Sequence, residues 1–149
     1  LADLYRQLNR DGDGENILRT AIAVAPAEAG LHYALGLTLN RLKRTDDWLG
    51  ELRRAAELDP NNARYPYVYA VGLHSAGRGG DAIAVLKDNL DKHPGDRDSL
   101  LAIVTFNRDS GNIASALDYA DRLVQLAPGD RQLSELVDAL RRQLKPAPQ

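Results

Sequence analysis

Residues 53–62 read RRAAELDPNN, and this stretch decides the fold. Pro60 ends a helix here, because the residue that precedes a proline avoids the α region, and Asn61 and Asn62 supply the turn. On both sides of this stretch a proline recurs every 34 residues, at Pro26, Pro60, Pro94 and Pro128. A fixed period of this length predicts stacked helix–turn–helix units whose apolar faces bury one another.

Each interval between these prolines contains two stretches of apolar periodicity, separated by a short polar turn. In residues 29–43 the leucines recur at steps of three and four, which is typical of a helix. Turns are predicted at residues 77–80 and 110–112, where Gly77 and Gly111 are one period apart. The sequence therefore predicts one all-α domain, an α-solenoid of antiparallel helix pairs. Its predicted parts are a truncated first repeat (1–28), three repeats (29–62, 63–96 and 97–130), a C-terminal capping helix (131–144) and a flexible tail (145–149).

Side chains of similar size recur at equivalent positions of the three full units. They are His32, Leu35, Gly36, Leu39, Trp48, Leu52 and Pro60, then Pro66, Tyr69, Ala70, Leu73, Ala82, Leu86 and Pro94, then Leu100, Ile103, Val104, Asn107, Ala116, Ala120 and Pro128. This pattern resembles the tetratricopeptide repeat (TPR) family, whose signature runs W-x2-L-G-x2-Y, then A-x3-F, then P. The resemblance covers essentially the whole chain. It implies a right-handed TPR-like superhelix that acts as a non-catalytic protein-binding scaffold, and it leaves the partner open.

Three residues depart from the family signature. Trp48 occupies a position that the family gives to a small Ala, against Gly36, so we expect either splayed helices in this unit or an indole turned outward. Asn107 stands at a usually aromatic position and Gly79 at another, which predicts weaker local packing. We also expect a mobile turn at residues 77–80, since ordering glycine costs more chain entropy than ordering other residues.

The first helix of each pair lines the concave face in this family, and the 34-residue period aligns equivalent side chains there in columns. Aromatic and aliphatic side chains form the predicted floor, and Asn, His and Arg form a partly basic wall. We expect a groove for an extended or helical peptide whose acidic groups face this wall. The alternative is an ordinary solvated face on which the tyrosines pack against their neighbours. The predicted groove residues are Tyr33, Leu37, Asn40, Arg41, Tyr67, Val71, His74, Leu101, Thr105 and Arg108.

Composition argues against several classes of function. The formal net charge is −2 and no long basic block occurs, so no nucleic-acid surface is predicted. The chain has no Cys, which excludes disulfides, thiol catalysis and cysteine-ligated metals. No apolar run approaches the ~18 residues of a membrane span. No nucleophile, base and orienting group stand in a catalytic arrangement, so we predict no enzyme activity and no cofactor.

Two partial motifs are interpreted as non-functional. Residues 9–14 (NRDGDG) are similar to the front half of a calcium-binding loop, but Thr20 stands where a bidentate Glu is required. A helix connection explains this segment, so no metal is predicted. One version of the TPR family clamps the C-terminal carboxylates of a chaperone with Lys, Asn and Arg. The corresponding positions here hold Tyr33, Leu37, Val68, Asp98 and Ala102. The clamp is therefore absent.

The alternative to a peptide-binding module is a structural spacer or self-association element of a larger protein. The chain has no Met and begins at Leu1 within a predicted helix, so we interpret it as a piece of a longer chain. The apolar side chains that would then be incompletely covered are Leu4, Leu8, Ile17 and Ile22. Exposed apolar area of this kind favours a homodimer through the N-terminal repeat. Residues 32–77 are similar to repeat tails of large bacterial proteins, multihaem cytochromes among them, which suggests an exported parent; the compartment stays open.

Overall fold

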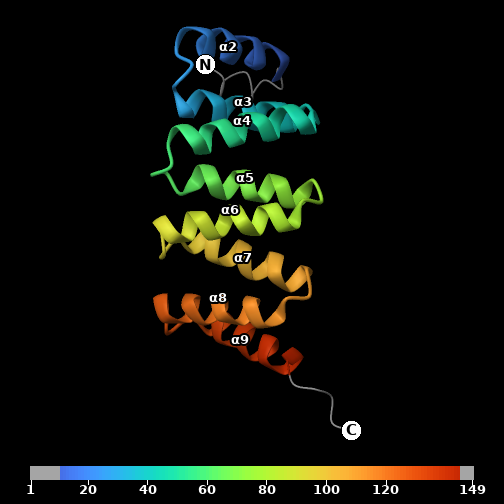
Figure 1. The fold of residues 1–149 in the computed structure, drawn as a ribbon, viewed down its shortest axis with the longest axis vertical. Coiled ribbons are helices and arrows are strands. Elements are labelled where there is room, and N and C mark those ends of the chain that lie inside the picture. Colours follow the sequence, from blue (N-terminus) through green and yellow to red (C-terminus); the bar gives the residue numbers. More distant parts are fainter. Residues whose placement is uncertain (1–10, 145–149) are drawn as a thin grey trace.

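The computed structural model describes residues 11–144, with the backbone alone at residues 11, 45 and 46. Within this range the chain forms eight α-helices and no strand. Figure 1 shows the helices stacked one above another along the long axis, with α2 at one end and α9 at the other. They are α2 (Asp11–Val24), α3 (Ala29–Arg41), α4 (Thr45–Leu58), α5 (Arg64–Ser75), α6 (Gly79–Lys92), α7 (Arg97–Asp109), α8 (Ile113–Leu126) and α9 (Arg131–Leu144).

Successive helices form antiparallel pairs that stack on one another. Within the pairs α3 packs on α4, α5 on α6 and α7 on α8, and neighbouring pairs meet through α4 with α5 and α6 with α7. The second helices begin at Thr45, Gly79 and Ile113, which are 34 residues apart. The all-α solenoid that the sequence predicts is therefore confirmed. The predicted turn at residues 77–80 is shorter than expected, because Gly79 and Gly80 already belong to α6.

Fully buried leucines at equivalent positions form the core between the helices. Leu35, Leu52, Leu73 and Leu86 are each at most 1% exposed, and burying such a side chain contributes about 1.5–3 kcal/mol. Close approach of α3 and α4 depends on Gly36. A Cβ atom there would lie 2.9 Å from the side chain of Leu52. The first full pair is thus tightly packed, and the expected splaying of its helices is wrong.

The indole of Trp48 points into the next repeat rather than outward. Trp48 is 7% exposed and belongs to the core. Its Cη2 and Cζ3 atoms lie over Gly72 of α5, where a Cβ atom would be only 2.6 Å away. A large ring on α4 is therefore accommodated by the absence of a side chain on α5. The expectation of an outward indole is wrong because it considered only the partner helix α3.

Asn107 is buried at the position where the family usually has an aromatic ring. It is 3% exposed, and its Nδ2 donates a hydrogen bond to the carbonyl oxygen of Ile103, at 2.8 Å within the same helix. A buried amide is tolerated when its polar atoms are paired, and this bond pairs one of them.

Acidic or amide side chains cap the first helices at positions one period apart. Asn62 accepts a hydrogen bond from the backbone N–H of Arg64, and Asp96 accepts one from Ser99 at 2.9 Å. Asp130 accepts from Gln132 and Leu133 at the start of α9. A salt bridge from Arg97, together with the N–H of Leu133, holds the pKa of Asp130 below its usual value. These caps satisfy N–H groups that have no partner within the helix.

The turns inside the three repeats share one left-handed residue. Gly77 and Gly111 both have φ +78°, and Lys43, one period before Gly77, has φ +58°. An L-residue in this region places its Cβ atom too close to the backbone, at a cost of roughly 1–2 kcal/mol that glycine avoids. Lys43 thus stores strain that the other two repeats do not have.

Replacing Lys43 by Gly is expected to raise the free energy of unfolding by about 0.5–1 kcal/mol, because relief of strain exceeds the extra entropy of the unfolded chain. Urea unfolding followed by helical circular dichroism measures the change. Lys43→Ala is the matched control, since alanine keeps the Cβ atom and should give no gain. Equal stability of the Gly and Ala variants would contradict the strain.

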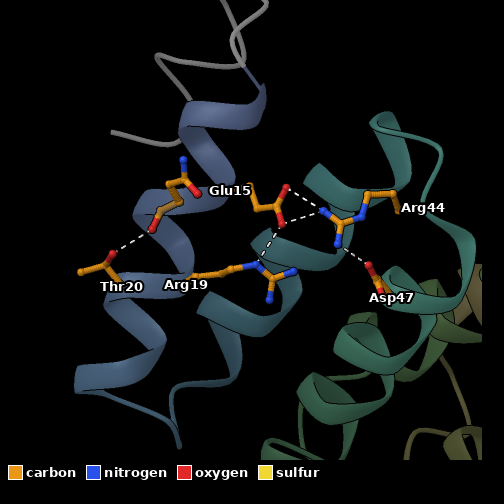
Figure 2. A network of polar contacts seen from close by, with 6 residues as sticks. Glu15, Arg19, Thr20, Arg44 and Asp47 are labelled. Carbon is orange, nitrogen blue, oxygen red and sulfur yellow. Dashed lines mark hydrogen bonds and ion pairs between the residues drawn. The ribbon is translucent and has the colours of Figure 1, made fainter.

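A charged network ties α2 to the turn between α3 and α4, as Figure 2 shows. Arg44 Nη1 donates to both carboxylate oxygens of Glu15, at 2.8 and 3.0 Å, and Arg44 also pairs with Asp47. Arg19 Nε donates to Glu15 at 2.9 Å. Burial tends to raise the pKa of Glu15, but the hydrogen bonds from Arg19 and Arg44 outweigh it and hold the pKa below its ordinary value.

Glu15→Gln is expected to lower the free energy of unfolding by about 1 kcal/mol at pH 7, because the charged hydrogen bonds become neutral ones. The folded-state pKa of Glu15 is depressed, so its contribution is complete above the unfolded value of 4.5 and is lost as the pH falls through the folded value. Urea unfolding at pH 7 and pH 3 should therefore show a difference between wild type and variant only at pH 7. Glu57→Gln, which removes an exposed pair with Arg53, should change stability by less than about 0.5 kcal/mol.

Candidate functional site

Four of the predicted groove residues surround one hollow. We call the surface of α3, α5 and α7 that carries the predicted groove residues the first-helix face. On it, α5 also contacts α7, and between them lies a hollow of about 270 Å³. Its lining consists of Tyr67, Val71, Leu101 and Thr105, together with Asp98, Ala102 and Phe106. Val71 and Leu101 are each 37% exposed, which is a large exposure for aliphatic side chains next to a hollow.

His74 lies next to this hollow and is held by residues of α7. Its imidazole stacks on the ring of Phe106, with the centroids 3.9 Å apart and an interplanar angle of 4°. Its Nε2 is 3.9 Å from a carboxylate oxygen of Asp109, and Arg108 pairs with the same carboxylate at 3.4 Å. The wall that the sequence predicts as partly basic therefore contains an acidic group that offsets part of its charge.

Tyr33 does not line the hollow and is engaged with the next repeat. Arg64 Nε donates to the Tyr33 hydroxyl at 3.1 Å, and the Tyr33 ring lies 5.0 Å from that of Tyr65. The bond to Tyr33 raises the pKa of Arg64, and the negative charge of Asp98 adds to this effect. The first-helix face thus carries a guanidinium group that the column analysis missed.

The remaining predicted groove residues lie on α3, away from the hollow. Leu37 is half-buried, and Asn40 and Arg41 are exposed. Arg41 donates to the Thr38 hydroxyl at 3.0 Å. The structure therefore brings the predictions for α5 and α7 together and leaves those for α3 apart.

Phe106 is the residue that sequence reasoning most clearly missed. It is the only Phe of the chain, it is 7% exposed, and it both stacks on His74 and lines the hollow. It directly follows Thr105, which was included. A lone aromatic beside a predicted groove column was the available signal.

A family model described as "Tetratricopeptide repeat" matches residues 1–63 and 72–131. The chain belongs to the tetratricopeptide repeat family. Proteins of this family are generally non-catalytic scaffolds for protein–protein interaction, which agrees with the resemblance drawn from the sequence. No curated protein sequence matches this TPR chain.

Solved structures of TPR proteins superpose on nearly the whole chain. The crystal structure of MamA has a TM-score of 0.81 at 14% identity, and the match covers 96% of this chain and 84% of MamA. YrrB, described as a TPR protein with an unusual peptide-binding site, has a TM-score of 0.74 at 20% identity, covering 93% and 71%. The first TPR of Spaghetti (RPAP3), bound to the HSP90 peptide SRMEEVD, has 0.68 at 12%, covering 78% and 93%. At these identities the likeness concerns the fold.

His32, predicted to be packed rather than catalytic, is buried in this TPR domain and bonded on both sides. Its Nδ1 is 2.7 Å from a carboxylate oxygen of Glu51, and its Nε2 is 3.0 Å from the carbonyl oxygen of Pro26. Both partners accept hydrogen bonds, so the two bonds exist together when both ring nitrogens carry protons. His93 similarly contacts the carbonyl oxygen of Pro60, at 3.3 Å. These contacts join neighbouring repeats.

Metal and membrane features were also compared with expectation. Asp11–Gly14 begins α2 and does not form the helix connection that was expected, and Thr20 donates to the carbonyl oxygen of Asn16. Residues 9 and 10 lie outside the described range. In residues 11–144 no three His, Asp or Glu side chains gather as metal ligands. None of the described helices has both the length and the apolar character of a membrane span.

Proposed function

We propose that this TPR domain is a non-catalytic interaction module that binds a peptide segment of a partner protein along its first-helix face. The observation that carries the proposal is the hollow between α5 and α7, bordered by the exposed aliphatic side chains of Val71 and Leu101. An apolar side chain of the peptide would enter this hollow beside Tyr67. Interfaces are enriched in such aromatic residues, and buried anchors supply most of their binding energy.

Charges around the hollow define what the peptide carries next to its apolar anchor. Arg64 lies toward α3, and Arg108 lies toward the end of α7 and shares Asp109 with His74. Asp98 lines the hollow itself. We expect a peptide with an apolar anchor and a mixed charge pattern rather than a strongly acidic one. Support at the level of the fold comes from TPR structures described as peptide-binding or peptide-bound.

The test is selection of a displayed library of random 12-residue peptides on the wild-type chain, followed by measurement of Kd by fluorescence polarisation. We expect Tyr67→Ala combined with Leu101→Ala to weaken binding at least tenfold, because the anchor loses its apolar contacts. Leu126→Ala, an exposed aliphatic position on α8, is the matched control and should bind normally. Unchanged affinity in the double variant, with the fold retained, would refute this site.

A second candidate function is self-association through the end formed by α2. A hollow of about 570 Å³ there is lined almost only by apolar groups, among them Ile17, Ala21 and Leu31, and the adjoining Val24 is 84% exposed. Ile22 is half-buried on the core, and Leu4 and Leu8 lie outside the described residues. Sedimentation velocity should show a dimer that Val24→Asp dissociates. A single-chain mass for the wild type at high concentration would exclude this alternative.

A further inference from the structure

A second groove lies on the opposite side of α5, between α4 and α6. We call it the outer groove. Its volume is about 460 Å³, and α5 contributes Pro66 and Tyr69 to it. Tyr67 and Val71, which line the hollow of the first-helix face, project roughly 150° away around the same helix at ~100° per residue. The outer groove is therefore separate from the site of the proposed function.

The next repeat shows why this groove is open. Shifting its residues by 34 positions replaces Ala56 by Leu90, Pro66 by Leu100 and Asn89 by Leu123. Those three leucines are 3%, 0% and 0% exposed, so the equivalent space between α6 and α8 is filled by core side chains. The outer groove exists because smaller or polar residues stand at these positions in a single repeat interface.

Asn89 brings an unsatisfied acceptor to the wall of the groove. It is 2% exposed, and its Nδ2 donates to the carbonyl oxygen of Ala63 at 3.0 Å and to the Ser99 hydroxyl at 2.8 Å. Its Oδ1 is buried and has no hydrogen-bond partner among the residues that the structure describes. Buried polar atoms are rarely left in this state, so the oxygen calls for a donor from outside the chain.

The floor and the rim of the groove define the chemistry of an occupant. Apolar atoms of Ala56, Pro60, Tyr69 and Val85 form the floor. The rim carries one charge of each sign on each flanking helix, namely Arg53 and Glu57 on α4 and Asp88 and Lys92 on α6. Since these charges cancel, the groove complements an apolar segment without net charge.

We propose that the outer groove binds an uncharged, apolar segment of extended polypeptide from a partner protein. The segment places an aliphatic or proline side chain on Tyr69 and Val85 and donates one backbone N–H to Asn89 Oδ1. This goes beyond the proposed function, because it gives the domain a second peptide site on the other side of the same helices. One chain could then hold two segments at once.

The experiment closes the groove with the residues of the next repeat. A library of random 12-residue peptides is selected on the full chain carrying Tyr67→Ala and Leu101→Ala, so that the first-helix site cannot contribute. Selected peptides are then measured on the same chain with Ala56→Leu and Pro66→Leu added. We expect Kd to rise at least tenfold, with an unchanged or higher melting temperature, since both leucines are natural at the equivalent positions.

Two further arms decide the result. Methylation of one backbone amide in the selected peptide should weaken binding at least tenfold, as expected if that N–H donates to Asn89. Val85→Lys, which blocks the groove from the surface of α6, serves if the closed variant does not fold. Selection of no peptide, or of peptides that bind open and closed chains equally, would overturn the proposal and leave the first-helix site untouched.

Discussion

Trp48→Ala is expected to lower the free energy of unfolding by about 3–4 kcal/mol, although alanine is the residue that the TPR family usually has at this position. The indole fills the space between α4 and α5 and is 7% exposed. Removing it leaves a cavity that Gly72 cannot fill, and removal of a buried Trp or Phe side chain costs about 3–5 kcal/mol. Urea unfolding followed by circular dichroism measures the loss.

The same contact predicts that Gly72→Ala changes sign with the residue at position 48. In the wild type the new Cβ atom would lie 2.6 Å from the indole, and we expect a loss of about 1–3 kcal/mol through overpacking. In the Trp48→Ala background the clash is gone, and replacement of a helical glycine should add about 0.5–1 kcal/mol. Gly50→Ala, on α4 with open space around its Cβ position, is the control and should be stabilising in both backgrounds. Additive effects at positions 48 and 72 would contradict the contact.

His32→Leu is expected to cost about 2 kcal/mol, which is the second large effect. The substitution keeps an apolar side chain of similar size but leaves the Glu51 carboxylate and the Pro26 carbonyl without their partner. Unpaired groups of this kind cost about 1–3 kcal/mol each when buried, and Glu51 is partly solvated. Unfolding by urea at pH 6 measures the loss.

The control for His32 is Glu51→Gln, which retains an acceptor for Nδ1. We expect it to cost less than about 1 kcal/mol, since one neutral hydrogen bond replaces a charged one. Hydrogen exchange should place the effect of His32→Leu at the start of α3 and in α4. A variant as stable as the wild type would show that the two bonds contribute nothing net.

The fold could be predicted because it depends on a regular period and on local signals. The recurring prolines stop helices, and the leucine spacing defines their buried stripes. The contact between Gly36 and Leu52 follows from the same pattern, since both residues belong to one helix pair. Where a residue faced the next repeat, the sequence was less informative. A glycine inside the apolar pattern of α5, where helix propensity disfavours it, was the signal for the position of the Trp48 ring.

The candidate site was predictable only in part, for a similar reason. Tyr67, Val71, Leu101 and Thr105 were placed in adjacent columns, and the structure brings them to one hollow. The engagement of Tyr33 with Arg64, 31 residues later, and of His74 with Phe106 depends on rotamers and on the angle between repeats. A period gives the register of side chains along the stack, but it does not give their mutual contacts.

The fit of Trp48 over Gly72 makes the order of the units specific. One period later, the equivalent positions hold Ala82 and Phe106, so a large–small pair is followed by a small–large pair, and both residues are buried. Exchanging the two units would set an indole against a phenyl ring at one junction and leave a void at another. Each junction therefore accepts only its own neighbour, and a chain shuffled at its 34-residue boundaries should fail to assemble although every unit still matches the family.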